Sequence, residues 1–307
     1  MFRKSQSWND FRDQEREFYR RQSEGIERCR RGFCWLHKLR LATDGAHCLF
    51  DTERGHRVRF AGEVFRVVLE RFGVQSDGDE VSQEAFFVTL VPSHSHFVTS
   101  DEPDALPIHA LRQWVSSALR NFSYVGMIEP AYFVNVGLGP FEGTRLISWH
   151  AHLLVWGCSR RELSLAIRRI NRREEPLFPG AKVALSKRVE DRELGETLAY
   201  VLKSPTNQYT ASPRRDPRRA RPDAAAEIDP DGLRSRILTA MEPLQPTRCR
   251  IRKSEMSGLN LVRLFRVMWE VRLDHLLIAG GDGSELRKTI VDRLPRPRQR
   301  HRASRSR

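Results

Sequence analysis

Two histidines separated by a single residue, His150 and His152, lie in the middle of an apolar stretch that runs from Ile147 to Trp156. Alternate residues of a β-strand point to the same face, so the spacing predicts two imidazoles side by side, with backbones about 7 Å apart. The other face of the stretch is entirely apolar, which predicts packing against a core. Two imidazoles on one strand face can bind the same metal ion. The alternative is a pair of half-buried histidines that are hydrogen-bonded to neighbouring groups.

A second candidate for chemistry is Tyr200, which is followed three residues later by Lys203. Residues 190–204 have helical spacing, and Pro205 should end that helix. A phenol one turn from an ammonium group provides a nucleophile with a cation beside it, which could stabilise phosphate charge or favour the phenolate. Glu196, one turn before the tyrosine, could accept a proton or position water, or it is a solvated surface residue. The alternative for the whole motif is an exposed amphipathic helix with an ordinary tyrosine.

A carboxylate, Glu129, belongs to the strand expected before the histidine strand. The residues from Tyr124 onward, a glycine-rich turn around Pro140 and the histidine strand together predict a β-hairpin. In that hairpin Glu129 falls opposite the His150–His152 segment, within one residue of register, where it could be a third metal ligand. Pro130 leaves a second reading open, a surface glutamate at a strand kink or bulge.

Three further segments have clear patterns. Residues 86–91 are β-branched and aromatic and predict a central strand, and residues 108–122 and 163–170 have helical spacing. The end of the last helix carries four arginines, Arg168, Arg169, Arg172 and Arg173. Such a cluster is either solvated surface or a contact for DNA phosphates.

Four motifs occur in a characteristic order: Phe87-Val88-Thr89-Leu90, Glu129, His150-Ala151-His152 and Tyr200-x-x-Lys203. In order and rough spacing they resemble the HUH endonuclease superfamily, and more narrowly the rolling-circle replication initiator (Rep) proteins with one catalytic tyrosine. The resemblance covers about residues 80–205. Two features depart from the family pattern, namely Val91 where a threonine often follows the first motif, and the longer distance along the chain from Glu129 to the histidines.

The resemblance implies an α+β fold, a central antiparallel sheet with helices on one face and an open metal face. Outside the resemblance, spacing and charge predict a helical N-terminal and a basic C-terminal flank. It also implies that His150, His152 and Glu129 hold Mg²⁺ or Mn²⁺, with the imidazoles favouring Mn²⁺. Tyr200 would attack a DNA phosphate to form a 5′-phosphotyrosine bond and free a 3′-hydroxyl, assisted by Lys203. The implied substrate is single-stranded or hairpin DNA at the replication origin of a plasmid or similar element, and the resemblance leaves room for a host helicase as a partner.

Composition bounds the remaining possibilities. The 307 residues carry a formal net charge of +14, which favours polyanionic partners, nucleic acid first. There is no apolar run of about 18 residues and no apolar signal core at the start, so we expect a cytoplasmic protein without a membrane partner. The five cysteines are odd in number and scattered, which fits reduced thiols better than a disulfide framework.

The resemblance and the composition shifts on either side of it together divide the chain into five expected regions. These are a helical accessory region (1–80), an HUH-like nicking domain (81–205), a flexible basic linker (206–232), a helical C-terminal region (233–293) and a basic disordered tail (294–307). In the fourth region, residues 259–277 are expected to form one long amphipathic helix.

Three other functions remain open from the sequence. A single-tyrosine transposase or relaxase would use the same chemistry. A non-catalytic basic nucleic-acid-binding protein would carry the histidines as structural residues. A hydrolytic zinc enzyme would use the H-x-H strand alone, although the net charge of +14 and the tyrosine helix argue against it.

Overall fold

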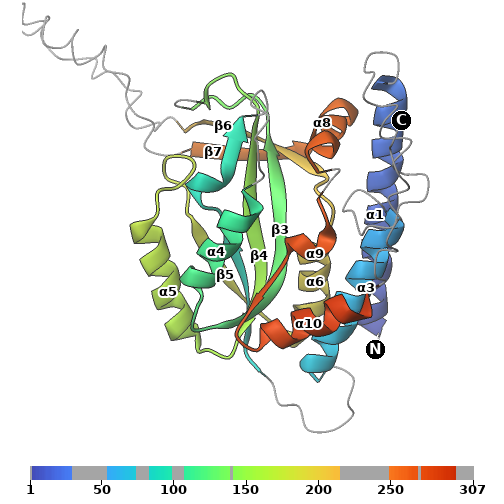
Figure 1. Cartoon of the computed structure of the whole chain (residues 1–307). Helices are drawn as coiled ribbons and strands as arrows, with labels where there is room; N and C mark the ends of the chain where they lie inside the picture. The colour runs from blue at the N-terminus through green and yellow to red at the C-terminus, as the bar shows by residue number, and fades with distance from the viewer. Residues whose placement is uncertain are drawn as a thin grey trace, which may run out of the picture.

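The computed structural model describes residues 2–29, 54–73, 83–98, 107–138, 141–214, 249–268 and 271–294. In these ranges a curled, mainly antiparallel sheet is combined with several helices, in agreement with the predicted α+β class (Figure 1). Most of the predicted linker and nearly all of the predicted basic tail lie outside the described residues. No helix within the described ranges is long and apolar enough to cross a membrane.

The described strands form one eight-stranded sheet in the order β5-β1-β4-β3-β6-β7, with β2 paired to β4 and β8 paired to β3. Their bounds are β1 Ala85–Leu90, β2 His96–Val98, β3 Ser123–Phe133, β4 Leu146–Trp156, β5 Ala184–Val189, β6 Asn207–Pro213, β7 Cys249–Glu255 and β8 Leu277–Gly280. The pairing of β3 with β6 is parallel, and the other strand pairs are antiparallel. As predicted, β1 is an interior strand, between β5 and β4.

Helices connect and flank these strands. Their bounds are α1 Phe2–Cys29, α3 Arg54–Arg71, α4 Ile108–Ala118, α5 Arg160–Arg173, α6 Leu194–Leu202, α8 Gly258–Met268, α9 Leu273–Leu276 and α10 Gly283–Arg293. In Figure 1, α1 and α3 stand on one side of the sheet and α5 on the opposite side.

Helices cover both faces of the sheet, so the prediction of helices on one face is wrong. On the apolar face, Ser116 of α4 hydrogen-bonds to Tyr124 of β3, the partner of Val155. On the histidine face, Tyr200 of α6 contacts His152, and Phe72, just after α3, packs against Trp156. The cause is in β4 itself, because Leu154 and Trp156 follow the histidines on their face and also need to be removed from water.

The C-terminal part of the described chain differs most from expectation. Residues 207–213, predicted as linker, form β6, and residues 249–255 form the neighbouring edge strand β7. The predicted long helix over 259–277 is also wrong, because α8 ends at Met268 and Leu277 begins β8. Edge strands such as β7 are exposed along most of their length, so they lack the apolar alternation by which strands are recognised.

The close approach of β3 and β4 gives a test of this architecture. A Cβ atom added to Gly126 would lie 2.0 Å from the carbonyl oxygen of His152, and the backbone of β4 cannot move away without disturbing the sheet. We expect Gly126→Ala to lower the free energy of unfolding by about 3 kcal/mol in urea denaturation. Gly55→Ala is the control, since nothing lies within 4 Å of the added atom and alanine favours a helix. Wild-type stability of Gly126→Ala would contradict the pairing of β3 with β4.

Candidate metal and nucleophile site

The register of the central hairpin brings the three predicted ligand residues together. Glu129 of β3 lies directly opposite His150 of β4, which confirms the predicted register. Pro130 introduces no bulge and pairs with Trp149. Along the other edge of β3, β8 pairs with residues 124–127 and β6 with residues 132–133, so the proline falls in the gap between them. A residue without an N–H group is tolerated at such an unpaired position.

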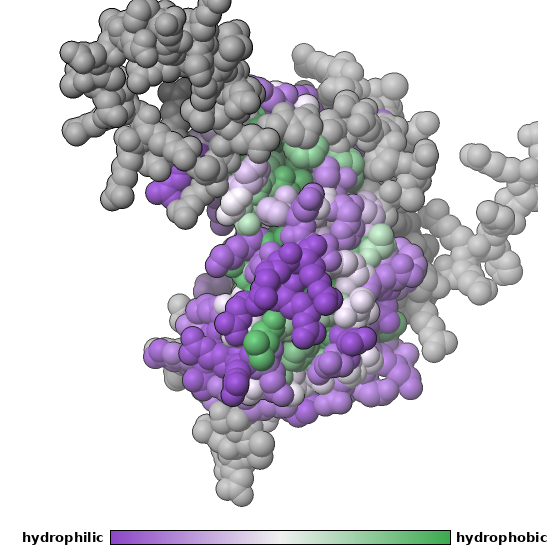
Figure 2. Space-filling view, turned by 90° about the vertical axis from the view of Figure 1, so that its left-hand side faces the viewer, coloured by the Kyte–Doolittle hydropathy of each residue, from purple (hydrophilic) through white to green (hydrophobic). Residues whose placement is uncertain are grey.

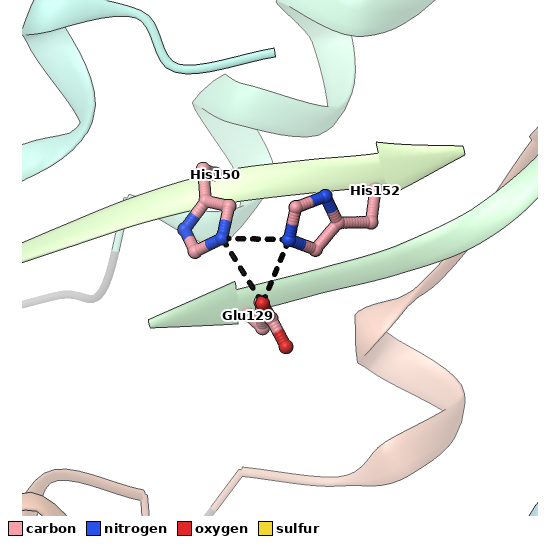
Figure 3. Close-up of side chains that lie close together, drawn as sticks. All are labelled: Glu129, His150 and His152. Atoms are coloured by element: carbon pink, nitrogen blue, oxygen red, sulfur yellow. Dashed lines mark hydrogen bonds and ion pairs between the residues drawn. The ribbon is translucent and has the colours of Figure 1, made fainter. Parts of the chain in front are cut away.

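The side chains of the three residues converge on one point (Figure 3). The Nε2 atoms of His150 and His152 are 3.1 Å apart. Oε1 of Glu129 lies 3.1 Å from Nε2 of His150 and 2.8 Å from Nε2 of His152. All three side chains are buried, with 4 to 8% of each residue exposed.

On the far side of each ring, Nδ1 has a hydrogen-bond partner that can accept its proton. Nδ1 of His150 lies 3.5 Å from the carbonyl oxygen of Ser148, which can only accept a hydrogen bond. Nδ1 of His152 lies 3.0 Å from the hydroxyl of Thr89 on β1. With the protons on Nδ1, the Nε2 lone pairs of both rings point toward the carboxylate of Glu129. This arrangement is the usual one for histidines that bind a metal ion.

The charges of the cluster follow from burial and proximity. Burial lowers the pKa of His152, against the opposing effect of Glu129, and therefore favours a neutral imidazole at neutral pH. Burial alone would raise the pKa of Glu129, but the charge of His152 and hydrogen bonds with both histidines hold that pKa well below its usual range. At neutral pH these directions favour a carboxylate at Glu129 and a neutral ring at His152.

A metal ion fits this state better than hydrogen bonding alone. Two nitrogen lone pairs and a carboxylate oxygen face one another at about van der Waals distance or less, which is unfavourable unless a proton or a cation lies between them. The second carboxylate oxygen of Glu129, Oε2, is also buried and accepts no hydrogen bond from a described residue. The cluster of Glu129, His150 and His152 could therefore hold a metal ion.

Tyr200 and Lys203 lie beside this cluster. The ring centroid of Tyr200 is 5.1 Å from that of His152 and 5.5 Å from that of Phe87, while 42% of the tyrosine stays exposed. Nζ of Lys203 lies over the tyrosine ring, 3.3 Å from its centroid. Burial and the charge of Glu129 raise the pKa of Tyr200, and burial lowers that of Lys203. The phenol is thus protonated at neutral pH, and its ring packs against that of His152.

Other predicted site residues are not brought to the cluster. Glu196 is exposed and forms no hydrogen bond or ion pair with Glu129, His150 or His152. The four arginines of α5 are also exposed, and α5 lies beside α4 on the opposite face of the sheet, where Trp114 hydrogen-bonds to Glu174 at 3.1 Å. Any contact between these arginines and DNA would therefore be separate from the histidine face.

The sequence motifs do not predict a role for three further residues near the cluster. Thr89 belongs to the first motif, and its pairing with His152 explains why a hydroxyl is useful there. Tyr209 of β6 pairs with Lys253 of β7. Burial, Glu129 and Tyr200 raise the pKa of Tyr209 to about 12, and Lys253 acts on Tyr200 to lower its pKa. No local sequence signal identifies the last two, because the strand pairing that positions them joins segments about 40 residues apart.

Comparisons with protein-family models, with curated proteins and with solved structures find no match for this chain.

A metal-binding measurement tests the cluster. We expect Mn²⁺ at about 100 times its dissociation constant to raise the free energy of unfolding by about 2.7 kcal/mol, because the ion binds only the folded state. His152→Ala or Glu129→Gln should abolish this gain in thermal unfolding and in calorimetric titration. His96→Ala is the matched control. His96 also belongs to an H-x-H sequence, but it lies on β2 and is not one of the three residues whose ligand atoms come together. Equal Mn²⁺ binding by His152→Ala would rule out the site.

Proposed function

We propose that this protein is a metal-dependent endonuclease of the HUH type, which nicks and rejoins single-stranded DNA through Tyr200 to start rolling-circle replication of a plasmid or similar element. The observation that carries the proposal is the contact between the Tyr200 ring and His152, a member of the buried Glu129–His150–His152 cluster. The order of the four motifs and the net charge of +14 support the same function.

In the proposed reaction, the hydroxyl oxygen of Tyr200 attacks the phosphorus of a DNA phosphodiester. The bond from phosphorus to the 3′ oxygen breaks, the 5′ end becomes linked to the tyrosine, and the phenolic proton is finally transferred to the leaving 3′ oxygen. A divalent ion bound by the cluster would supply Lewis-acid stabilisation of the phosphate charge. Lys203, next to the ring, adds a positive charge at the same place. Attack by a 3′-hydroxyl on the phosphotyrosine reverses these steps and rejoins a strand.

The chemistry of the three ligand residues favours one kind of ion over another. Two imidazoles and one carboxylate suit Mn²⁺ better than Mg²⁺, which prefers oxygen ligands.

A separate surface of the protein is suited to hold the DNA backbone. Arg168, Arg169, Arg172 and Arg173 are exposed on α5, and none forms an ion pair with another described residue. Figure 2 looks onto the side of the molecule where α5 lies and shows a broad hydrophilic area there. Exposed arginines without an ion-pair partner among the described residues can bind phosphates, so we propose that α5 contacts DNA away from the cleavage site.

Nicking can be tested with labelled single-stranded hairpin oligonucleotides and Mn²⁺. We expect a covalent protein–DNA adduct that Tyr200→Phe lowers by about a thousandfold or more, because the nucleophile is lost. Tyr209→Phe is the matched control, since this second tyrosine lies near the cluster but on β6, and it should still form the adduct. A protein that only binds nucleic acid would instead shift the oligonucleotides equally well in a chelator and form no adduct.

The α5 surface predicts a change in salt dependence without a change in chemistry. Each lost phosphate contact lowers the slope of log affinity against log salt by about 0.7 for single-stranded DNA. The double variant Arg168→Ala, Arg172→Ala loses up to two such contacts. We expect the magnitude of its slope to fall by about 1.4 while cleavage of bound DNA keeps its rate. The control removes Arg16 and Arg20, which are exposed on α1 but paired with Asp13 and Glu17. An unchanged slope in the α5 variant would exclude this surface from DNA binding.

A further inference from the structure

The end of the tyrosine helix is held by two charged side chains from the N-terminal helices. Arg57 of α3 donates hydrogen bonds to the carbonyl oxygen of Leu202, from Nε at 3.1 Å and from Nη2 at 2.7 Å, and to that of Lys203 at 2.5 Å. Glu15 of α1 accepts hydrogen bonds from the backbone N–H of Ser204 at 2.7 Å and from its hydroxyl at 2.6 Å. Three consecutive residues after Val201 are therefore fixed by one pair of side chains.

These contacts satisfy groups that the helix leaves unpaired. The last carbonyl groups of an α-helix have no donor within the helix, and Pro205 prevents α6 from continuing. The guanidinium of Arg57 supplies both the donors and a positive charge at the negative end of the helix dipole. Its Nε lies 3.5 Å from a carboxylate oxygen of Glu15, so each charge of the pair also faces its opposite.

Both charges are almost completely buried, with 1% of Glu15 and 3% of Arg57 exposed. Removing two ions from water offsets much of their attraction, so the attraction between the two charges itself adds little net stability. The ion pair instead fixes geometry. The planar guanidinium donates hydrogen bonds and the carboxylate accepts them, and together they define the backbone conformation of the segment that they bind. The pair is thus better suited to define a position than to increase stability.

The segment that is held in place, residues 202–204, directly follows the turn of α6 that carries Tyr200, the proposed nucleophile. Arg57 binds the backbone of Lys203, whose ammonium group lies over the ring of Tyr200, and that ring packs against His152. We infer that Glu15 and Arg57 are positioning residues, which hold the end of α6 so that Tyr200 and Lys203 face the metal cluster. We call the Glu15–Arg57 pair the clamp. The catalytic meaning of this inference rests on the proposed nicking function, whereas the clamp itself rests only on the hydrogen bonds to residues 202–204.

The inference separates two properties of the site. The ligands Glu129, His150 and His152 lie on β3 and β4, whereas the hydrogen bonds of Glu15 and Arg57 described above go to the end of α6. Tyr200 and Lys203 lie on the segment that the clamp fixes. Loosening the clamp should therefore reduce cleavage while metal binding stays intact.

The first experiment compares Glu15→Gln and Arg57→Lys with the wild type in the full chain. A misplacement of about 1 Å in a reacting group can lower a rate about a hundredfold, so we expect kcat for nicking to fall by about ten- to a hundredfold. The KM for the oligonucleotide and the dissociation constant for Mn²⁺ should stay within about twofold of the wild type. Glu17→Gln is the matched control, since it removes a carboxylate two residues further along α1 that pairs with Arg20 at the surface.

The second experiment needs no activity. In amide hydrogen exchange, Glu15→Gln should speed exchange of the Ser204 amide and of the last turn of α6, while the amides of α5 keep their rates. Unchanged exchange at Ser204 would overturn the inference, as would a parallel loss of kcat and of Mn²⁺ affinity, which indicates general loss of structure. A wild-type protein that does not nick at all refutes the proposed function, and the exchange result then decides whether the clamp exists.

Discussion

The pairing of β3 with β4 is the constraint on which the rest of the site depends. Because side chains alternate along a strand, one register puts Glu129, His150 and His152 on the same face, and a slip of one residue would move Glu129 to the other face. Gly126 allows the two backbones to approach closely beside His152. The same register leaves the opposite face of β4 to the core, so the force that folds the sheet also assembles the ligand set.

The site also depends on a contact between parts of the chain that are far apart in sequence. Helix α6 has nine residues, too few to be stable alone, and its direction is set by what it packs against. Glu15 and Arg57 bind its end from 189 and about 145 residues away. The described part of the predicted accessory region therefore supports the helix that carries Tyr200, through side-chain hydrogen bonds to residues 202–204.

The contrast between the locally determined hairpin and the tertiary placement of α6 explains how much could be predicted from the sequence. The hairpin, its register and the face of the histidines follow from local alternation and a turn, and the apolar side of α6 follows from helical spacing. The second layer of helices did not follow, although Leu154 and Trp156 on the histidine face indicate that this face needs cover. The strands β6 and β7 carry mostly polar residues at a sheet edge, and the partners of α6 are chosen by tertiary packing. Neither leaves a periodic signal in the sequence.

The charge of the cluster links metal binding to the proposed reaction. Without a cation, the buried carboxylate of Glu129 gives the site a negative charge, which repels a phosphate and raises the pKa of Tyr200. A divalent ion held by Glu129, His150 and His152 would bring two positive charges against that single negative one and would reverse the sign of the local field. Lys203 adds to the same positive field from above the tyrosine ring. In the proposed reaction, a bound ion would therefore favour both attraction of the DNA phosphate and ionisation of the phenol.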